Sequence, residues 1–470
     1  MTVTHSRDCH LAFTSFTLLY YAPIAVSAFN YTVTAKTATT SLTRQLLKEP
    51  KKEGKRVEVQ SLTLKTTMND HEKLALIREV MPVTQKSVYL NTGTAGPLSS
   101  VTLKALHQAN LFDYEVGRGS LNSIKPIIDA VAQLREAFAR LVNARPEEIA
   151  LTHHTTDGMN IVLHGLRWQP GDEVVSTTLE HQGGLFPLAV LRQRHGVVLN
   201  FVDIKPEDTA SEIVAKLEAA ITPRTRLLVF SHIAWNTGFC LPMEEIVAMA
   251  HRHHVLTLVD AAQSIGAMPL DLPASGVDFY AMPGQKWLCG IEGTGALYVR
   301  EDRISIVEPT FVGYYSSQPN AFDLTGHFLP AKGAKRYEVG TIYRPGIKAM
   351  LANLTWLEEI VGWEWIYNRI ASLTEYTYNA LKAIPQVTLV TQAGVQSGLI
   401  SFYLDNYDPA RVTTKLQEKN IVVRFLPYPY CLRIAVGFYN SKKDIDHLIR
   451  ELRAITEMEP DELPEFVPPY

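Results

Sequence analysis

Cysteine is scarce in this chain: only four of the 470 residues are cysteine, at positions 9, 240, 289 and 431. Their spacing resembles no zinc site, and they are too few for a disulfide framework. A strong excess of charge is also lacking, because the formal net charge is −3 and no basic stripe is present. These absences argue against a cysteine-held metal centre, a disulfide-stapled secreted domain and a nucleic-acid-binding protein. We therefore expect no metal, no nucleic-acid partner and a reducing, cytoplasmic location.

The apolar stretch at residues 11–29 is interrupted by Thr, Ser and Pro, and only Arg7 precedes it as a Lys or Arg residue. A signal peptide or a short membrane anchor is one interpretation of this stretch. We favour the other, in which residues 1–67 are a disordered extension, or translation starts at Met68 before a helix-like segment at 70–81. On that interpretation no membrane partner is expected, and the first 67 residues are dispensable for folding.

What the chain does contain is a regular alternation of strand-like and helix-like segments. Helical patterns, such as those at 211–221 and 243–254, separate most of the apolar runs. This alternation predicts an α/β fold with a mostly parallel, doubly wound seven-stranded sheet. The strand-like runs lie at 148–154, 173–179, 197–203, 225–233, 256–260, 278–282 and 295–300.

A chain of this length is too long for one ordinary core, so we expect more than one domain. The expected parts are an N-terminal arm at 68–99, a large domain at 100–345, a small α+β domain at 346–458 and a disordered tail at 459–470. In the large domain, helices at 101–111 and 127–143 flank a polar loop. In the small domain we expect one long helix at 353–384, strands at 387–390, 398–404 and 421–425, and an amphipathic helix at 441–455.

Two strand ends carry the residues around which a site can be built. The run 256–260 ends on Asp260, and the run 278–282 leads to Lys286. Parallel strands bring their carboxyl ends to one edge of a sheet, so the two side chains should meet there. An amine and an acid suit a ligand with an aldehyde and a basic ring nitrogen, which describes pyridoxal phosphate. Lys286 can form a Schiff base, Asp260 can keep the ring nitrogen protonated, and Gln263 can reach the phenolic oxygen.

Three loops at the same predicted edge carry further polar residues. Thr155 and Thr156 precede a helical pattern, and hydroxyls with free amides at a helix N-terminus can hold a phosphate. His181 follows the run 173–179 and can stack on the ring. His232 and Asn236 follow residues 226–231 and fall near the oxygen face of the ring. Each is weak evidence alone, because a Thr before a helix is usually a cap and a loop histidine usually has no special role.

In order along the chain stand TTDGMN, LEHQGG, SHIAWNTG, VDAAQSIG, GQKW, RYEVGT and RIAVGFYNS. This series resembles the class V aminotransferase family, in the cysteine desulfurase-like branch of the fold type I pyridoxal phosphate enzymes, over about residues 85–455. The resemblance implies pyridoxal phosphate as the cofactor and a homodimer, since Gly340 and Thr341 would reach the phosphate of the neighbouring subunit. The cofactor-binding residues that it implies or that lie beside its motifs are Lys286, Asp260, Gln263, His181, Thr155, Thr156, His232 and Gln285.

Within this branch the chain is most similar to cystine and cysteine C–S lyases, and next to isopenicillin N epimerase-like proteins. Arg424 and Arg433, with Asn236, match the expected substrate site, where two guanidinium groups can grip an amino acid carboxylate. For Arg424 an ordinary surface strand residue is an equally good interpretation. Arg433 is flanked by Leu432 and Ile434, which makes that interpretation harder.

The chain also departs from the pattern of its relatives. Cysteine desulfurases carry a persulfide cysteine on a flexible loop, whereas the connection here, residues 425–430, is short and rich in Pro and Tyr. We interpret Cys431 as a small core residue and not as a nucleophile. Gln285 replaces the usual histidine, and Pro283 replaces a phosphate-contacting hydroxyl.

We expect a β-elimination on cysteine, cystine or a sulfur conjugate. The open alternatives are racemisation or epimerisation, transamination, desulfuration through a persulfide, and a non-catalytic homologue that binds the cofactor. Retention of both Lys286 and Asp260 argues against the last of these.

Overall fold

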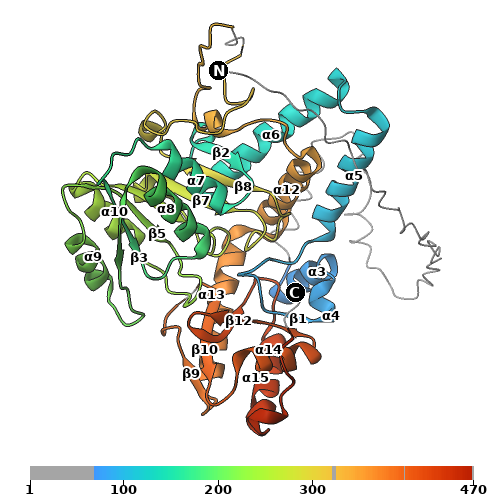
Figure 1. The fold of residues 1–470 in the computed structure, drawn as a ribbon. Helices are drawn as coiled ribbons and strands as arrows, with labels where there is room; N and C mark the ends of the chain where they lie inside the picture. The colour runs from blue at the N-terminus through green and yellow to red at the C-terminus, as the bar shows by residue number, and fades with distance from the viewer. Residues whose placement is uncertain (1–67, 320–323, 396, 468–470) are drawn as a thin grey trace, which may run out of the picture. The chain divides into compact units, whose positions relative to one another are not determined.

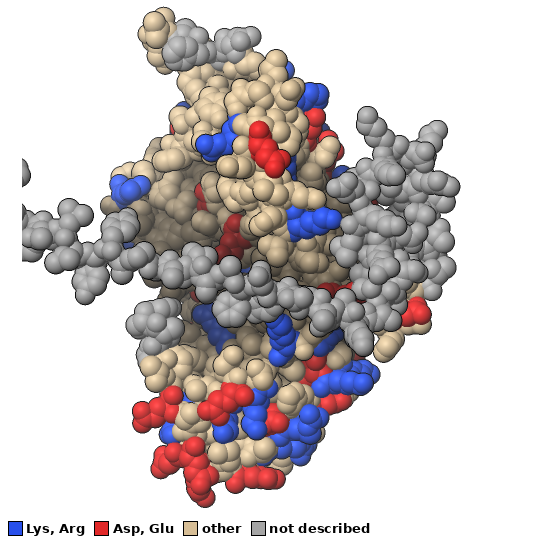
Figure 2. All heavy atoms as spheres, turned by 90° about the vertical axis from the view of Figure 1, so that its right-hand side faces the viewer, with Lys and Arg blue, Asp and Glu red and all other residues tan. Residues whose placement is uncertain are grey.

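The computed structural model describes residues 68–319, 324–395 and 397–467. The expectations for residues 1–67 lie outside this part of the chain. Within the described ranges no helix is long and apolar enough to cross a membrane. On the face seen in Figure 2, acidic and basic side chains are intermingled and do not gather in a basic patch.

A seven-stranded sheet forms the centre of the larger part of the fold (Figure 1). All seven predicted runs are strands of this sheet, in the order β2-β8-β7-β6-β5-β3-β4. Strand β8 is antiparallel to both of its neighbours, and the remaining pairs are parallel. The predicted mostly parallel sheet is thus confirmed. The strands are β2 (Ile149–Thr152), β3 (Glu173–Thr177), β4 (Val198–Val202), β5 (Thr225–Ser231), β6 (Leu256–Asp260), β7 (Phe279–Pro283) and β8 (Gly295–Val299).

Helices cover both faces of the sheet because both faces of its strands are apolar. On β5, Leu227 and Val229 belong to one core cluster, whereas Leu228 and Phe230 belong to the other. This alternation follows from the two-residue period of a strand. The first cluster includes α7 (Thr155–Gly165) and α8 (Gln182–His195), and the second includes α6 (Leu121–Leu141), α9 (Ala210–Ala219) and α10 (Met243–Arg252).

A smaller antiparallel sheet has the strand order β12-β13-β10-β9. Its strands are β9 (Val387–Leu389), β10 (Leu399–Leu404), β12 (Arg424–Pro427) and β13 (Tyr430–Ala435), with α14 (Pro409–Glu418) and α15 (Lys442–Thr456) in the same core. The N-terminal arm joins this unit, because β1 (Val88–Tyr89) pairs in parallel with β11 (Ile421–Val422). The run predicted as one strand at 421–425 is therefore divided between two sheets.

Two helix predictions were wrong in their extent. The helix expected at 353–384 is broken: α12 (Arg344–Trp356) passes into a π-helical turn (Leu357–Val361), and α13 (Trp363–Lys382) begins after Gly362. Gly362 has φ 86°, a left-handed conformation that glycine adopts without a Cβ penalty. The polar loop expected at 112–120 is shorter, because α5 continues to residue 116. The other helices are α3 (Asp70–Val80), α4 (Val83–Lys86), α5 (Ser100–Val116) and α11 (Leu272–Ser275).

The tail predicted as disordered is ordered as far as residue 467. Leu463 is buried in the core of the small sheet, and Phe466 packs edge-on against Phe425 with ring centroids 5.0 Å apart. Arg411 donates to the backbone carbonyls of Asp461 and Leu463. The prediction of disorder rested on the prolines and acids of this segment, but the apolar side chains of Leu463 and Phe466 anchor it.

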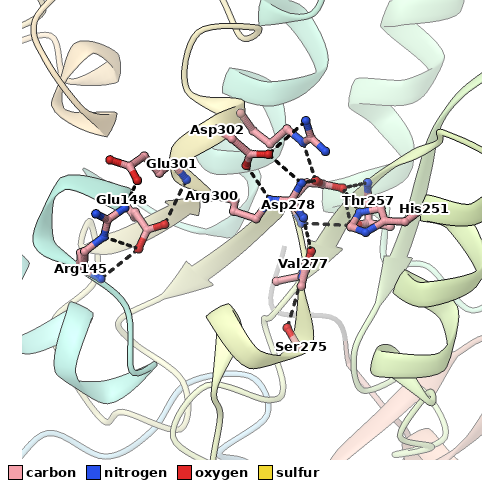
Figure 3. Close-up of polar contacts among 12 residues, drawn as sticks. Arg145, Glu148, His251, Thr257, Ser275, Val277, Asp278, Arg300, Glu301 and Asp302 are labelled. Carbon is pink, nitrogen blue, oxygen red and sulfur yellow. Dashed lines mark hydrogen bonds and ion pairs between the residues drawn. The ribbon is translucent and has the colours of Figure 1, made fainter.

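At the amino-terminal edge of β6 and β7, Asp278 is the centre of a buried polar network (Figure 3). Its side chain is 0% exposed and accepts hydrogen bonds from the Thr257 N–H and hydroxyl at 2.8 and 3.0 Å. His251 Nε2 lies 2.9 Å away. Arg300 and Arg303 form ion pairs with it at 3.0 and 2.9 Å. One carboxylate thus joins the starts of two strands to the segment after β8.

Candidate active site

Asp260 and Lys286 lie at the opposite, carboxyl-terminal edge of the sheet. Asp260 is the last residue of β6, and Lys286 follows the end of β7. The two strands are adjacent and parallel, with Asp260 opposite Ala281. The side chains are close enough for each to change the pKa of the other. The structure therefore brings together the amine and the acid on which the sequence prediction rests.

Burial changes the proton affinity of both groups. Burial, opposed by the charge of Asp260 and assisted by the charges of Arg433 and Arg424, lowers the pKa of Lys286 to about 8. Burial raises the pKa of Asp260, although Lys286 and the Ala262 N–H, 2.8 Å from Oδ1, favour its ionised form. Near neutral pH a useful fraction of Lys286 is consequently the neutral amine that nucleophilic attack and proton abstraction require.

The amide of Gln263 is fixed by hydrogen bonds to Gly93 and Trp287. Its Nε2 donates to the Gly93 carbonyl at 3.0 Å, and its Oε1 accepts from the indole N–H of Trp287 at 2.8 Å. An amide nitrogen carries two hydrogens, so one remains for a ligand oxygen. The orientation of Gln263 is thus set by the N-terminal arm and by the residue that follows Lys286.

The N-terminus of α7 has the features of an anion site. Thr155 and Thr156 occupy its first two positions, and the side chain of His154 caps the helix by accepting from the Asp157 N–H at 3.0 Å. Thr155 Oγ1 and Gln285 Oε1 are buried and have no hydrogen-bond partner within the described part of the chain. Buried polar atoms are normally paired, so the unpaired Thr155 hydroxyl at a helix N-terminus is available to a ligand.

His181 holds a fixed and neutral imidazole at the start of α8. The Gly183 N–H donates to its Nδ1 at 3.0 Å, which places the ring proton on Nε2. Burial, followed by the positive charges of Lys286 and the two arginines, lowers the pKa of His181 to about 4. The ring meets Trp235 edge-on, with centroids 5.1 Å apart.

His232 is buried behind Asp260. Its backbone N–H donates to the Asp260 carbonyl at 3.0 Å, and its Nδ1 lies 2.8 Å from the hydroxyl of Tyr280. Burial lowers the pKa of His232 to about 4, so this ring is neutral as well. Asn236 lies in the loop after β5. Its Oδ1 is buried and has no partner among the described residues, and its Nδ2 lies 3.5 Å from the Tyr428 carbonyl.

Arg424 and Arg433 face each other across β12 and β13. Arg433 is 1% exposed and donates to the Trp235 carbonyl at 2.8 Å and to Thr94 Oγ1 at 3.2 Å. Its Nε is unpaired, and no carboxylate of the described chain contacts it. Burial, followed by the nearby charge of Arg424, lowers its pKa to about 9, which still leaves it protonated near neutral pH. A buried cation without a counter-ion is costly, so this position suits an anionic ligand.

Gly340 and Thr341 do not join this cluster through any contact of the described residues. Both have positive φ, at 115° and 50°, and the Thr341 N–H donates to the Tyr314 hydroxyl at 3.0 Å. Thr341 is exposed. The remaining predicted residues are gathered at the carboxyl edge of the sheet or on the arginine hairpin.

Glu180 is a buried acid for which no role was predicted. It accepts from the Thr177 hydroxyl at 2.6 Å and from the Ser231 N–H and hydroxyl at 3.1 and 2.7 Å. Burial raises its pKa to about 7, and the nearby charge of Asp260 adds to the shift. Its place directly before His181 was the available signal, but one of its partners, Ser231, comes from a different strand.

Comparison with known proteins places these features in a family. The model of the aminotransferase class-V family matches residues 88–448. A probable cysteine desulfurase of Methanothermobacter thermautotrophicus is 30% identical over 398 residues, covering 81% of this chain and 98% of that protein. Isopenicillin N epimerase of Streptomyces clavuligerus is 30% identical over 389 residues, covering 78% and 95%.

Solved structures of the cystine C–S lyase C-DES are also similar. Its complex with the product cysteine persulfide has a TM-score of 0.74 and 33% identity, covering 79% of this chain and 98% of that one. A C-DES variant with glycine covalently linked to its pyridoxal phosphate cofactor has a TM-score of 0.75 and 34% identity, covering 80% and 98%. By its family match, its relatives and its fold, this chain belongs to the aminotransferase class-V family.

Proposed function

We propose that the protein is a pyridoxal phosphate-dependent C–S lyase that eliminates sulfur from the β-carbon of cysteine, cystine or a sulfur conjugate. The observation that carries the proposal is the pair of Lys286 and Asp260 at adjoining strand ends, with the pKa of the lysine lowered to about 8. The similarity to C-DES supports the choice of reaction.

The residues of the site fit the proposed cofactor. Thr155 Oγ1, at the first position of α7, is a buried hydroxyl without a partner among the described residues, which suits a phosphate at the start of this helix. When bound, pyridoxal phosphate supplies an electron sink for charge that develops on the substrate α-carbon. The residues proposed to hold it are Lys286 at the aldehyde, Asp260 at the ring nitrogen, Gln263 and His232 on the oxygen side, His181 on the ring face, and Thr155, Thr156 and Gln285 at the phosphate.

Each protein group then has a defined task. The neutral amine of Lys286 removes the α-proton of the substrate. Asp260 would keep the ring nitrogen of the cofactor protonated and so positively charged. The neutral ring of His181 covers the site without adding charge. Arg433 holds the substrate carboxylate through charge-assisted hydrogen bonds. Elimination releases a thiol or persulfide, with pyruvate and ammonia after hydrolysis.

The lowered pKa of Lys286 predicts how the cofactor-free protein takes up pyridoxal phosphate. Only the neutral amine attacks the aldehyde, so the rate should rise about tenfold per pH unit below pH 8 and level off above it. Stopped-flow absorbance at a series of pH values measures this rate. In Asp260→Asn the plateau should begin at lower pH, because Asp260 raises the pKa of the lysine. A rate still rising steeply at pH 10 in the unmodified protein contradicts the assignment.

Removal of Arg433 should weaken turnover without releasing the cofactor. We expect Arg433→Ala to lower kcat/KM by at least about 30-fold, because the substrate carboxylate loses a charge-assisted partner in a desolvated place. Cofactor content, read from absorbance after denaturation, should stay unchanged. Loss of cofactor in step with activity would instead place Arg433 at the phosphate.

Cys431 distinguishes a lyase from a desulfurase. Its side chain is 1% exposed, and burial raises the pKa of its thiol to about 12, so little thiolate is present near neutral pH. Elimination needs no protein thiol, and we expect Cys431→Ser to keep most of the activity. This variant also serves as a control for Arg433→Ala on the same strand. Loss of sulfur release in Cys431→Ser, with a persulfide trapped on Cys431 of the unmodified protein, would identify a desulfurase.

The proposal as a whole is tested with a substrate panel. Purified protein is incubated with cysteine, cystine and sulfur conjugates, and pyruvate and the stereochemistry of the recovered substrate are measured. We expect pyruvate in proportion to released thiol or persulfide. Racemised substrate without pyruvate would contradict the lyase and support the epimerase alternative suggested by the similarity to isopenicillin N epimerase.

We further propose that the protein is a homodimer. Large apolar side chains remain exposed on α5, including Leu103 and Tyr114, and at the start of α6, where Leu121 is exposed. Exposed apolar patches of this kind mark interaction surfaces. Arg344, near the exposed Thr341, donates to the carbonyl of residue 118 between these helices at 2.7 Å. Sedimentation velocity should give twice the chain mass, and a monomer at working concentration would contradict the proposal.

A cytoplasmic location is proposed from the thiols. Cys240, Cys289 and Cys431 are free, and the last two are buried. Free thiols persist in a reducing compartment. Fractionation of the cells that make the protein would test the location, and its appearance outside the cytoplasm would contradict it.

A further inference from the structure

A short segment of the N-terminal arm, residues 91–96, contacts both Gln263 at the edge of the large sheet and the two arginines of the small sheet. The Gly93 carbonyl accepts from Gln263, whose amide oxygen accepts from the indole N–H of Trp287, the residue after Lys286. The next residue, Thr94, contacts both arginines of the small sheet. The arm therefore reaches the proposed cofactor side and the proposed substrate side within two successive residues.

The hydroxyl of Thr94 uses its full hydrogen-bonding capacity. It donates to Asn91 Oδ1 at 2.8 Å, and it accepts from Arg424 Nη1 at 3.1 Å and from Arg433 Nη2 at 3.2 Å. A hydroxyl has one donor hydrogen and two acceptor positions. Because Asn91 takes the proton, both acceptor positions are left for the two guanidinium groups. Thr94 is itself exposed, so this arrangement lies on the open side of the site.

The arginines require such a partner because they repel each other. Arg424 and Arg433 are directly opposite on neighbouring strands, where like charges are destabilising. The Thr94 hydroxyl accepts a hydrogen bond from both guanidinium groups and directs them to one point, while both keep their positive charge. Arg433 Nε remains unpaired within the described residues, so that edge of the guanidinium is open to a ligand.

We propose that Thr94 is a positioning residue: it holds the guanidinium groups of Arg424 and Arg433 in the arrangement that receives the substrate carboxylate. The inference rests on the proposed function for the identity of the ligand, an α-amino carboxylate. It assigns to the N-terminal arm a part in substrate recognition that no motif in the sequence indicates.

The test measures the binding of glycine, which has the α-carboxylate but no leaving group. Glycine is titrated calorimetrically into the holoenzyme of the unmodified protein, Thr94→Val and Thr94→Ser. We expect Thr94→Val, which has similar size but no acceptor, to weaken glycine binding by about tenfold, and Thr94→Ser to bind within about twofold of the unmodified protein. With a sulfur substrate, the loss in Thr94→Val should appear in KM and not in kcat.

Thr92→Val is the matched control on the same segment. The Thr92 hydroxyl contacts the Ala435 carbonyl and the Tyr439 hydroxyl and not the arginines, so this change should leave glycine binding unchanged. The proposal is overturned if Thr94→Val binds glycine as the unmodified protein does, or if Thr92→Val weakens binding equally. If the protein binds glycine but releases no pyruvate from any sulfur substrate, the proposed function is wrong. The comparison of glycine binding between the Thr94 variants would still test the role of Thr94.

Discussion

Replacing Lys286 with alanine is expected to abolish turnover, with a loss of at least about 10,000-fold in kcat. Among the described residues, the Lys286 amine combines a position close to Asp260 with a pKa lowered to about 8. Its removal takes away both the covalent attachment of the cofactor and the base that removes the α-proton. Borohydride reduction followed by peptide mapping should find the cofactor on Lys286 in the unmodified protein and nowhere in the variant.

Lys286→Arg separates the charge of this residue from its chemistry. A guanidinium keeps a positive charge beside Asp260 but supplies no neutral amine near neutral pH. We therefore expect the same loss of turnover and of the reducible adduct as in Lys286→Ala. An adduct that forms on another lysine in either variant, with activity retained, would overturn the assignment of Lys286.

Replacing Asp278 with alanine is expected to lower the free energy of unfolding by about 3 kcal/mol or more. The carboxylate is 0% exposed, and its removal leaves Arg300, Arg303 and the Thr257 N–H without their shared acceptor (Figure 3). Removing one partner of a buried ion pair costs more than the pair contributes, because the remaining charge stays desolvated. The midpoint of urea unfolding of the holoenzyme, followed by circular dichroism, measures the effect.

Asp302→Ala is the control for this network. Asp302 contacts the same two arginines, but its side chain is 59% exposed, and exposed pairs contribute at most about 1 kcal/mol. We expect a small shift in the midpoint for Asp302→Ala. Equal shifts for Asp278→Ala and Asp302→Ala would show that burial of Asp278 does not determine the strength of the network.

The large sheet could be predicted because its strands are buried on both faces and therefore form apolar runs. The end of such a run also has a known place, the carboxyl edge of a parallel sheet. For that reason the proximity of Asp260 and Lys286, which are 26 residues apart in the sequence, could be predicted from the ends of their strands. The break at Gly362 could not be read from periodicity, since the apolar pattern continues on both sides of it.

The contacts that hold the site in place were less predictable. Glu180 takes its hydrogen bonds from Thr177 and from Ser231 on a neighbouring strand, and Thr94 meets arginines more than 300 residues away. Ser, Thr and Glu are common at such positions for many reasons, so residue type alone carries little information. The pairing of β3 with β5 brings Ser231 to Glu180, and the path of the N-terminal arm beside the small sheet brings Thr94 to the arginines.

The hairpin between β12 and β13 is connected by Tyr428 and Pro429 alone. Two residues span at most about 7 Å when extended. This connection is therefore too short to carry a persulfide cysteine from the substrate to another protein. If the proposed lyase reaction is correct, its sulfur leaves as a small diffusible molecule and is not handed over on a protein arm. Recipients of that sulfur would then compete for it by concentration and reactivity, without having to dock on this protein.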